Sequence, residues 1–327
     1  MPFPIRTLAV LAATALSLAA VPAAAQDASY PDRPIVLVVP FPPGGTLDTA
    51  ARIVANELEG TLGQPVIVDN RSGAGGNIGA DFVAKSEPDG HTLLMGALST
   101  HGINVSLYPD MPFDPVADFV PISLVATTPN VLVVGEGIEA ASVEALAELA
   151  RSTEGGLTYA SGSSGSAGHL AGELLADRTG ASMTHVPYRG SAAALQAVLA
   201  GEVDFIFDNL ASASSHIGAG TVTALAVTTA ERSAFAQDLP TMREEGFEGF
   251  DITTWFGILA PAGTPETIVE RLNADIRDAL ASDRFQEAMA AQGSDVAPSS
   301  PREFADFIES EIARYGEIVR AADIRLE

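Results

Sequence analysis

Residues 35–62 read IVLVVPFPPGGTLDTAARIVANELEGTL and combine three patterns that are typical of one structural unit. Ile35–Val39 is an unbroken apolar run, which predicts a strand buried on both faces. Apolar side chains recur at helical spacing over Thr46–Leu62, and a turn rich in glycine and proline separates the two. A strand, a tight turn and a helix in this order indicate an α/β protein with parallel sheets.

The same alternation continues along the chain. We expect further strands near residues 66–68, 92–98, 122–126, 131–134, 157–160, 203–207 and 222–227. Helices fit between most of them, near residues 78–85, 143–151, 167–178, 192–200 and 212–217. After residues 253–260 the pattern changes, and helices follow at 265–281, 283–292 and 301–322. Two α/β units in one chain predict two lobes, with a ligand cleft beyond the carboxyl ends of the strands.

Composition and charge exclude several classes of protein. The chain of 327 residues has 17 Lys and Arg against 42 Asp and Glu, a net charge of −25, which argues against a nucleic-acid partner. The absence of Cys excludes a disulfide scaffold, a thiolate metal site and a cysteine nucleophile. The five His are scattered without metal-ligand spacing, so we expect neither a metal nor a cofactor.

The first 25 residues have the features of a secretory signal. Arg6 precedes the apolar run Leu8–Val21, and Ala23–Ala25 provides a small-residue cleavage pattern. The alternative, a membrane anchor, is disfavoured because the run is shorter than the ~20 apolar residues that a span requires. We therefore predict export to the periplasm and no membrane insertion after cleavage.

The turn at residues 40–48 is the first candidate for ligand binding. Gly44 and Gly45 allow the backbone to approach a ligand, and Thr46 stands at the start of the helix. The open N–H groups of a helix start favour an anion. The alternative is a capped connection that binds nothing.

The turn at residues 161–169, SGSSGSAGH, is the second candidate. Its hydroxyls and amides precede a helix and again suit an anion, although a flexible linker would have a similar composition. The nucleophile-elbow pattern Gly-x-Ser-x-Gly fits Gly162 and Ser164 but fails at Ser166. His169 is either a structural hydrogen-bonding residue or a base.

Other residues follow predicted strands with less specific patterns. Gly73, Gly75 and Gly79 resemble a dinucleotide fingerprint, but the spacing is off by one residue, so a tight turn at the cleft is favoured. Asp208 ends an apolar strand, and Arg189 offers a grip for a carboxylate or a solvated helix start. Further candidates with open alternatives are Ser99, His101 and Trp255.

Segments along the whole chain after the signal resemble the tripartite tricarboxylate transporter receptors, also called Bug receptors. They are residues 30–35 (YPDRPI), 39–45 (VPFPPGG), 70–79 (NRSGAGGNIG), 84–90 (AKSEPDG), 168–170 (GHL), 185–190 (HVPYRG), 207–209 (FDN), 255–257 (WFG) and 260–265 (APAGTP). The resemblance implies a periplasmic binding protein of the two-lobed Venus-flytrap type. Lobe 1 would comprise residues 26–124 and 252–327, and lobe 2 residues 125–251.

The resemblance also implies a function. Such a receptor is not an enzyme, is expected to be a monomer, and captures a small organic carboxylate, such as a di- or tricarboxylate, an amino acid or an aromatic acid. It delivers this ligand to a membrane permease of two subunits. Leu47 is a departure, because many relatives have a small polar residue there, and it removes a hydrogen bond from the site.

The sequence and the resemblance together predict a set of ligand-binding residues from both lobes. They are Phe41, Gly44, Gly45, Thr46, Asp48, Ser99, His101, Ser161, Ser163, Ser164, Gly165, Ser166, His169, Asp208 and Trp255. The alternative function is a secreted serine hydrolase that uses the Ser161–Ser166 turn, with His169 as the nearby base.

Overall fold

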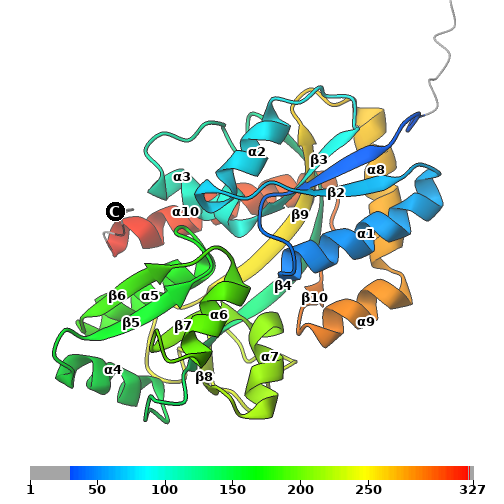
Figure 1. Cartoon of the computed structure of the whole chain (residues 1–327). Coiled ribbons are helices and arrows are strands. Elements are labelled where there is room, and N and C mark those ends of the chain that lie inside the picture. The colour runs from blue at the N-terminus through cyan, green and yellow to red at the C-terminus, as the bar shows by residue number, and fades with distance from the viewer. Residues whose placement is uncertain (1–29, 323, 325–327) are drawn as a thin grey trace, which may run out of the picture.

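The computed structural model describes residues 30–322 and residue 324. It shows an elongated α/β molecule of two lobes, through which a ten-stranded sheet runs (Figure 1). The predicted signal peptide, residues 1–25, lies outside the described residues. Within the described part of the chain, every helix is too short or too polar to span a membrane.

Strands and helices alternate through most of the chain, which confirms the predicted fold class. The strands are β1 (Ile35–Val39), β2 (Val66–Asn70), β3 (Thr92–Ala97), β4 (Phe119–Val134), β5 (Leu157–Ser161), β6 (Met183–Pro187), β7 (Phe205–Asn209), β8 (Thr223–Val227), β9 (Thr253–Pro261) and β10 (Asp295–Val296). The α-helices are α1 (Thr46–Leu62), α2 (Asn77–Ala84), α3 (Asn104–Leu107), α4 (Val143–Ser152), α5 (Ala167–Thr179), α6 (Ser191–Leu199), α7 (Leu210–Ala219), α8 (Glu266–Leu280), α9 (Asp283–Ala291) and α10 (Pro301–Ala321). Two short helical turns precede α2 and α3, namely η1 (Ala74–Gly76) and η2 (Ser99–Ile103).

Two ladders make up the sheet, and β4 belongs to both. In the first ladder β2, β1 and β3 are parallel neighbours, while β9 runs antiparallel to β3 and to β4. In the second, β6, β5 and β7 are parallel, while β4 pairs antiparallel with β7 and β8. The expected parallel arrangement therefore holds for three strands of each ladder, whereas β4, β8, β9 and β10 run antiparallel to their partners.

Strand β4 replaces the two separate strands expected at 122–126 and 131–134. It continues through the connecting residues and changes its partner between Pro129, opposite Thr253 of β9, and Asn130, opposite Asn209 of β7. Pro129 has no N–H to donate, so it fits best where a ladder is interrupted. The residues between the two expected strands thus mark the crossing from one lobe to the other.

Successive side chains of each strand point to opposite faces of the sheet and pack into separate hydrophobic cores. Leu37 and Val39 pack with α1, α8 and α9, while Val38 lies in the core beneath α2 and α10. This second core continues into the other lobe, where it includes residues of α4 and α5. A third core lies under α6 and α7.

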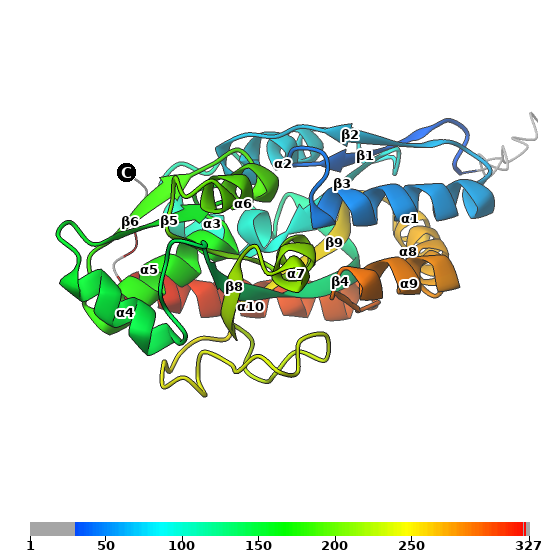
Figure 2. The same cartoon turned by 60° about the horizontal axis from the view of Figure 1, so that its bottom comes forward.

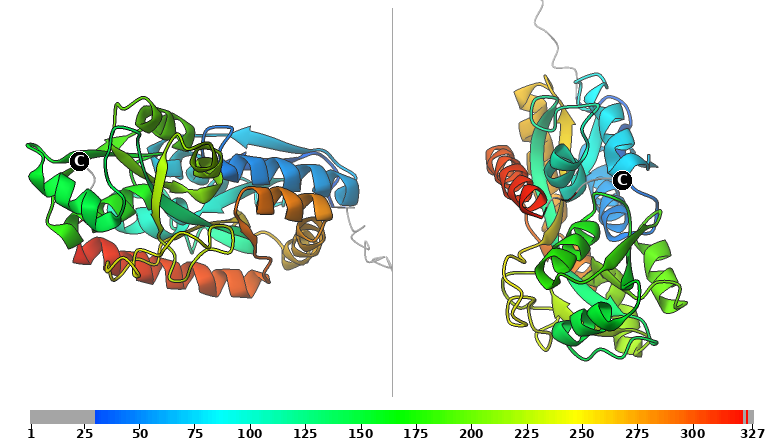
Figure 3. Two further views of the ribbon diagram at one scale, coloured as in Figure 1. Left: turned by 90° about the horizontal axis from the view of Figure 1, so that it is seen from below. Right: turned by 90° about the vertical axis from the view of Figure 1, so that its left-hand side faces the viewer.

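Helix α10 covers the core that both lobes share. Its start is a capping box in which Ser300 and Glu303 exchange hydrogen bonds, at 2.8 Å and 3.2 Å, with Pro301 at the first helical position. The helix lies along one face of the molecule and brings the C-terminal end beside the second lobe (Figures 2 and 3). Apolar side chains such as Phe304 and Ile308 anchor it.

Candidate functional site

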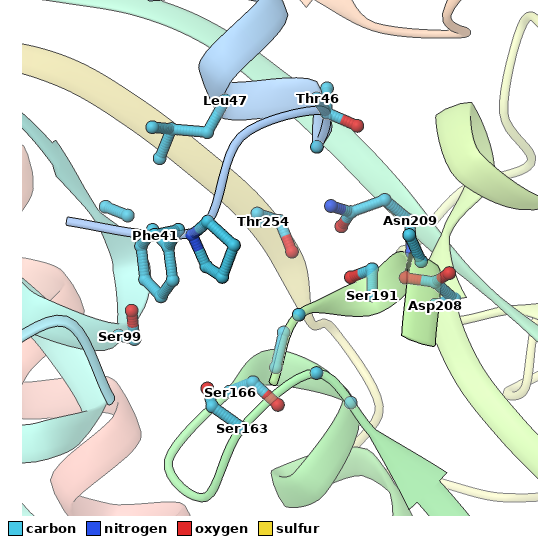
Figure 4. A pocket seen from close by; sticks show the side chains of 18 of the residues that line it. Phe41, Thr46, Leu47, Ser99, Ser163, Ser166, Ser191, Asp208, Asn209 and Thr254 are labelled. Atoms are coloured by element: carbon cyan, nitrogen blue, oxygen red, sulfur yellow. Dashed lines mark hydrogen bonds between the residues drawn. The ribbon is translucent and has the colours of Figure 1, made fainter. Parts of the chain in front are cut away.

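A cavity of about 160 Å³ lies between the lobes, where the carboxyl ends of several strands meet (Figure 4). Its walls are the loops that follow β1 and β3 in the first lobe and β5, β6 and β7 in the second. Asn130 of β4 and Thr254 of β9 also line it. This position agrees with the general rule that open α/β sheets bind ligands beyond the carboxyl ends of their strands.

The first-lobe wall is the β1–α1 loop, which Asp48 holds in place. The Asp48 carboxylate accepts hydrogen bonds from the Gly44 N–H and the Asn70 amide, both at 2.9 Å, and from the Arg52 guanidinium at 3.0 Å. Burial raises the pKa of Asp48, but hydrogen bonds from Arg52, Gly44 and Asn70 outweigh it and keep this pKa below its ordinary value. Asp48 therefore lines the cavity with its charge already compensated.

Glycine is required at the tip of this loop. Gly44 has φ +92°, in the region that side chains disfavour, and Gly45 is the N-cap of α1. Among the described residues no side chain caps α1, so the first N–H groups of the helix are open where Thr46 and Leu47 line the cavity. Of the residues that the sequence proposes for ligand binding in this loop, Phe41, Gly45 and Thr46 line the cavity, whereas Gly44 shapes the turn behind it.

The second-lobe wall is the β5–α5 loop. Ser163 and Ser166 line the cavity and lie below Phe41 and Thr46 in Figure 4, and the Ser166 side chain caps α5 by accepting a hydrogen bond from the His169 N–H at 3.3 Å. The helix start packs directly on β7, because a methyl group on Gly168 would lie 2.3 Å from the Phe207 carbonyl oxygen. The loop therefore has a fixed position relative to the sheet.

Asp208 and Asn209 form the far wall, at the end of β7. The buried Asp208 carboxylate accepts hydrogen bonds from the Asn209 N–H at 2.8 Å and from the Ser212 hydroxyl, and Ser191 lines the cavity beside it. Burial raises the pKa of Asp208, and these hydrogen bonds oppose the shift. This end of the cavity thus presents a buried acid together with polar groups, and it suits a hydroxyl or amide better than a second anion.

Four helices begin at the cavity. The first residues of α1, α5 and α6 line it, as does the N-cap residue Asn209 of α7. Helix starts carry a partial positive charge and N–H groups without intrahelical partners. Their convergence favours an anionic group in the middle of the cavity, as the two turns predict.

Several predicted residues lie away from this cavity. His101 is fully buried against Phe119, with a ring separation of 4.7 Å, and burial lowers its pKa to about 3. Trp255 is also buried, and its indole N–H donates to Glu311 at 2.8 Å. Both side chains belong to the core, because the apolar surroundings of η2 and β9 enclose them. Ser99, by contrast, lines the cavity.

The rest of the serine-rich turn supports the loop from behind. Ser161 is buried and bonded to His185 at 2.6 Å, and the Gly165 N–H donates to His169 at 3.2 Å. Burial lowers the pKa of His169 to about 4, so the ring is neutral and holds the loop as an acceptor. Ser164 faces a neighbouring cavity. Neither Ser161 nor His169 lines the cavity, which leaves the hydrolase alternative without an exposed serine and base side by side.

The predicted ligand-binding residues omit several residues that line the cavity, among them Asn130, Thr254 and Ser191. Asn130 and Thr254 come from adjacent strands 124 residues apart in sequence and share a hydrogen bond at 3.1 Å. Ser191 opens α6 beside Asp208. The available signal for Asn130 was a polar residue inside an apolar strand pattern, since a buried amide needs partners.

The family described as "Tripartite tricarboxylate transporter family receptor" matches residues 50–324. Protein BugT of Bordetella pertussis is 40% identical over 300 residues, which cover 91% of this chain and 92% of BugT.

Two solved structures from Rhodopseudomonas palustris are similar over almost the whole molecule. One, determined with adipate, has a TM-score of 0.87 and 39% identity, covering 91% of this chain and all of that chain. The other, MatC with bound malate, has a TM-score of 0.84 and 35% identity, covering 89% of this chain and all of that chain. Sequence and fold agree, and the chain belongs to the tripartite tricarboxylate transporter receptor family.

Proposed function

We propose that this protein is a periplasmic receptor that captures a small organic carboxylate between its lobes and delivers it to a two-subunit membrane permease. The observation that carries the proposal is the convergence of four helix starts, from both lobes, on one cavity. The family and the related structures with adipate and malate support a carboxylate ligand. Export would follow from the signal at residues 1–25, and the receptor would act as a monomer.

The mechanism follows from the division of the cavity between two lobes. We assign residues 26–124 and 252–327 to lobe 1 and residues 125–251 to lobe 2, with β4 and β9 as the connecting strands. Thr46 belongs to one lobe and Ser163 to the other, so a carboxylate bound to both has more contacts when the lobes are closed. A ligand shifts the population toward closure only by this difference in affinity.

The ligand contacts would come from backbone amides and hydroxyls. Gly45 and Thr46 would supply the first-lobe donors, and Ser163 and Ser166 the second-lobe donors. Phe41 and Leu47 would pack on the carbon chain of the ligand. Asp48 would act indirectly, through the conformation of the loop that it holds.

The test is calorimetric titration of the purified mature protein, guided by a thermal-shift screen over mono-, di- and tricarboxylates, amino acids and aromatic acids. The double variant Ser163→Ala/Ser166→Ala should bind the best ligand at least ~10-fold more weakly, because two donors to a charged group are lost. The matched control is Ser152→Ala/Ser310→Ala, which removes two exposed hydroxyls bonded to carbonyls of their own helices.

Two results would contradict the proposal. One is a thermal shift confined to cationic or uncharged compounds. The other is unchanged affinity in the folded double variant at the cavity. Turnover of simple esters that is abolished by Ser164→Ala would instead support the hydrolase.

A further inference from the structure

A second cavity, of about 470 Å³, adjoins the first between the lobes. The two cavities share the Phe41–Pro42 segment, the Gly162–Ser163 segment and the Arg189–Gly190 segment. Beyond them, the second cavity extends to the glycine-rich turn at residues 72–76 and to Tyr108 and Tyr188. The shared segments form a neck, and a molecule that is longer than the first cavity can pass through it into the second.

Residues of both lobes make the neck, and the space between them is narrow enough that an added methyl group would fill it. A methyl group on Gly190 of the second lobe would lie 3.5 Å from Cγ of Pro42 in the first. Gly190 also has φ +102°, which side chains disfavour. Arg189 is therefore presented at the junction of both lobes by a turn whose conformation depends on the next residue.

The composite cleft carries charges of opposite sign at the far wall of the first cavity and at the neck. Asp208 lies at the far wall of the first cavity, on the opposite side from Phe41 in Figure 4, and Phe41 lines both cavities. Among the described residues, no Asp or Glu lines the second cavity, and Arg189 is the basic side chain that lines both. A second negative charge on the ligand is thus disfavoured near Asp208 and favoured near Arg189.

Arg189 is also available for binding. Most of the described basic residues, such as Arg52 with Asp48, are paired with an acid, whereas the described part of the chain holds no ion pair to Arg189. Its side chain is exposed. A guanidinium can donate two parallel hydrogen bonds to a carboxylate, a geometry that ammonium cannot reproduce.

We propose that the ligand is a dicarboxylate and that Arg189 binds its second carboxylate in the second cavity. The inference rests on the proposed function, in which the first carboxylate lies among the helix starts of the first cavity. The carbon chain passes the neck against Phe41 and Pro42. Tyr108 and Tyr188 stand with Arg189 in the second cavity, where their hydroxyls offer additional donors.

The experiment is a calorimetric comparison of straight-chain α,ω-dicarboxylates of four to eight carbons with monocarboxylates of the same lengths. Arg189→Gln should lower the affinity for the best dicarboxylate by about 10- to 100-fold, which is the contribution of a charge-assisted pair. The affinity for the monocarboxylate of the same length should change by no more than about twofold. The dicarboxylate affinity of Arg189→Lys should lie between those of the unmodified protein and Arg189→Gln. Lysine keeps the positive charge but cannot donate two parallel hydrogen bonds to one carboxylate. Arg178→Gln is the control, since it removes an equal charge from an exposed position in the last turn of α5.

Three outcomes decide the matter. A selective loss for dicarboxylates in Arg189→Gln, absent in Arg178→Gln, supports the proposal. Equal losses for mono- and dicarboxylates, or no loss for either, overturn it while the receptor function stands. If the unmodified protein binds no carboxylate of any kind, the proposed function fails first and the role of Arg189 fails with it.

Discussion

Replacing Asp48 by alanine should both destabilise the protein and weaken its ligand, although the carboxylate need not touch the ligand. In the structure this buried carboxylate accepts hydrogen bonds from Gly44, Asn70 and Arg52. Asn70 additionally donates to the Phe41 carbonyl at 3.0 Å, so one amide ties both ends of the β1–α1 loop. Asp48→Ala removes the acceptor at the centre of this arrangement.

The magnitude follows from the surroundings of the three donors. Arg52 is 51% exposed, and the Gly44 N–H lies in an exposed turn, so both reach water in the variant and contribute little. The half-buried Asn70 amide loses a charged acceptor. We expect a total loss of about 2 kcal/mol in the free energy of unfolding. At ~2.1 cal/mol/K per residue, a chain of this size then melts ~3 °C lower.

The assay pairs thermal unfolding with ligand titration. Without Asp48 the β1–α1 loop is no longer held in its binding conformation, so the free-energy cost of ordering it is incurred on binding. The affinity for the ligand should therefore fall by roughly 10-fold. Asp275→Ala is the control, because it breaks a pair with Arg271 four residues away on a helix outside the cleft. Unchanged affinity in Asp48→Ala, together with an unchanged melting temperature, would refute the idea that this carboxylate organises the loop.

Three further outcomes test other parts of the structure. The stabilising effect of Asp48 should be fully present above its pKa in the unfolded chain, about 3.8, and should disappear as the pH falls through its lower pKa in the folded protein. Acid unfolding curves of the unmodified protein and of Asp48→Ala should therefore converge below about pH 4. Gly168→Val should cost about 3 kcal/mol, since its side chain would meet the Phe207 carbonyl, and chemical denaturation measures this loss. Trp255→Phe should lower stability by about 1–2 kcal/mol, because Glu311 loses a buried donor, while ligand affinity in calorimetry stays unchanged, as expected of a core residue.

The two loops of the candidate site could be predicted because their signals are local. A strand, a glycine- or serine-rich turn and a helix are contiguous in the chain, and their geometry places open N–H groups at the cleft. Phe41, Thr46, Ser163 and Ser166 line the cavity for this reason. The α/β fold with two lobes is predictable on the same grounds.

Other features depend on contacts between distant segments, which a local pattern does not contain. Trp255 is buried because Glu311 and Phe304, about 50 residues later, come to it on α10. His101 belongs to the core because Phe119 packs against its ring. Asn130 and Thr254 meet only after β4 and β9 pair across the lobes.

The chain is strongly acidic, yet its proposed ligand is an anion. The two are compatible because each acid at the first cavity is compensated by its own hydrogen-bond partners. Asp48 faces Arg52, which neutralises it locally, and Asp208 accepts hydrogen bonds from Asn209 and Ser212 on the far wall. Neither carboxylate projects a free charge into the middle of the cavity, where four helix starts act. The remaining acids form a field of the wrong sign for capture, which salt screens over about 10 Å. Association with a carboxylate should therefore accelerate as salt is added up to ~0.2 M, and stopped-flow rates that fall with salt would show that local positive groups dominate even at long range.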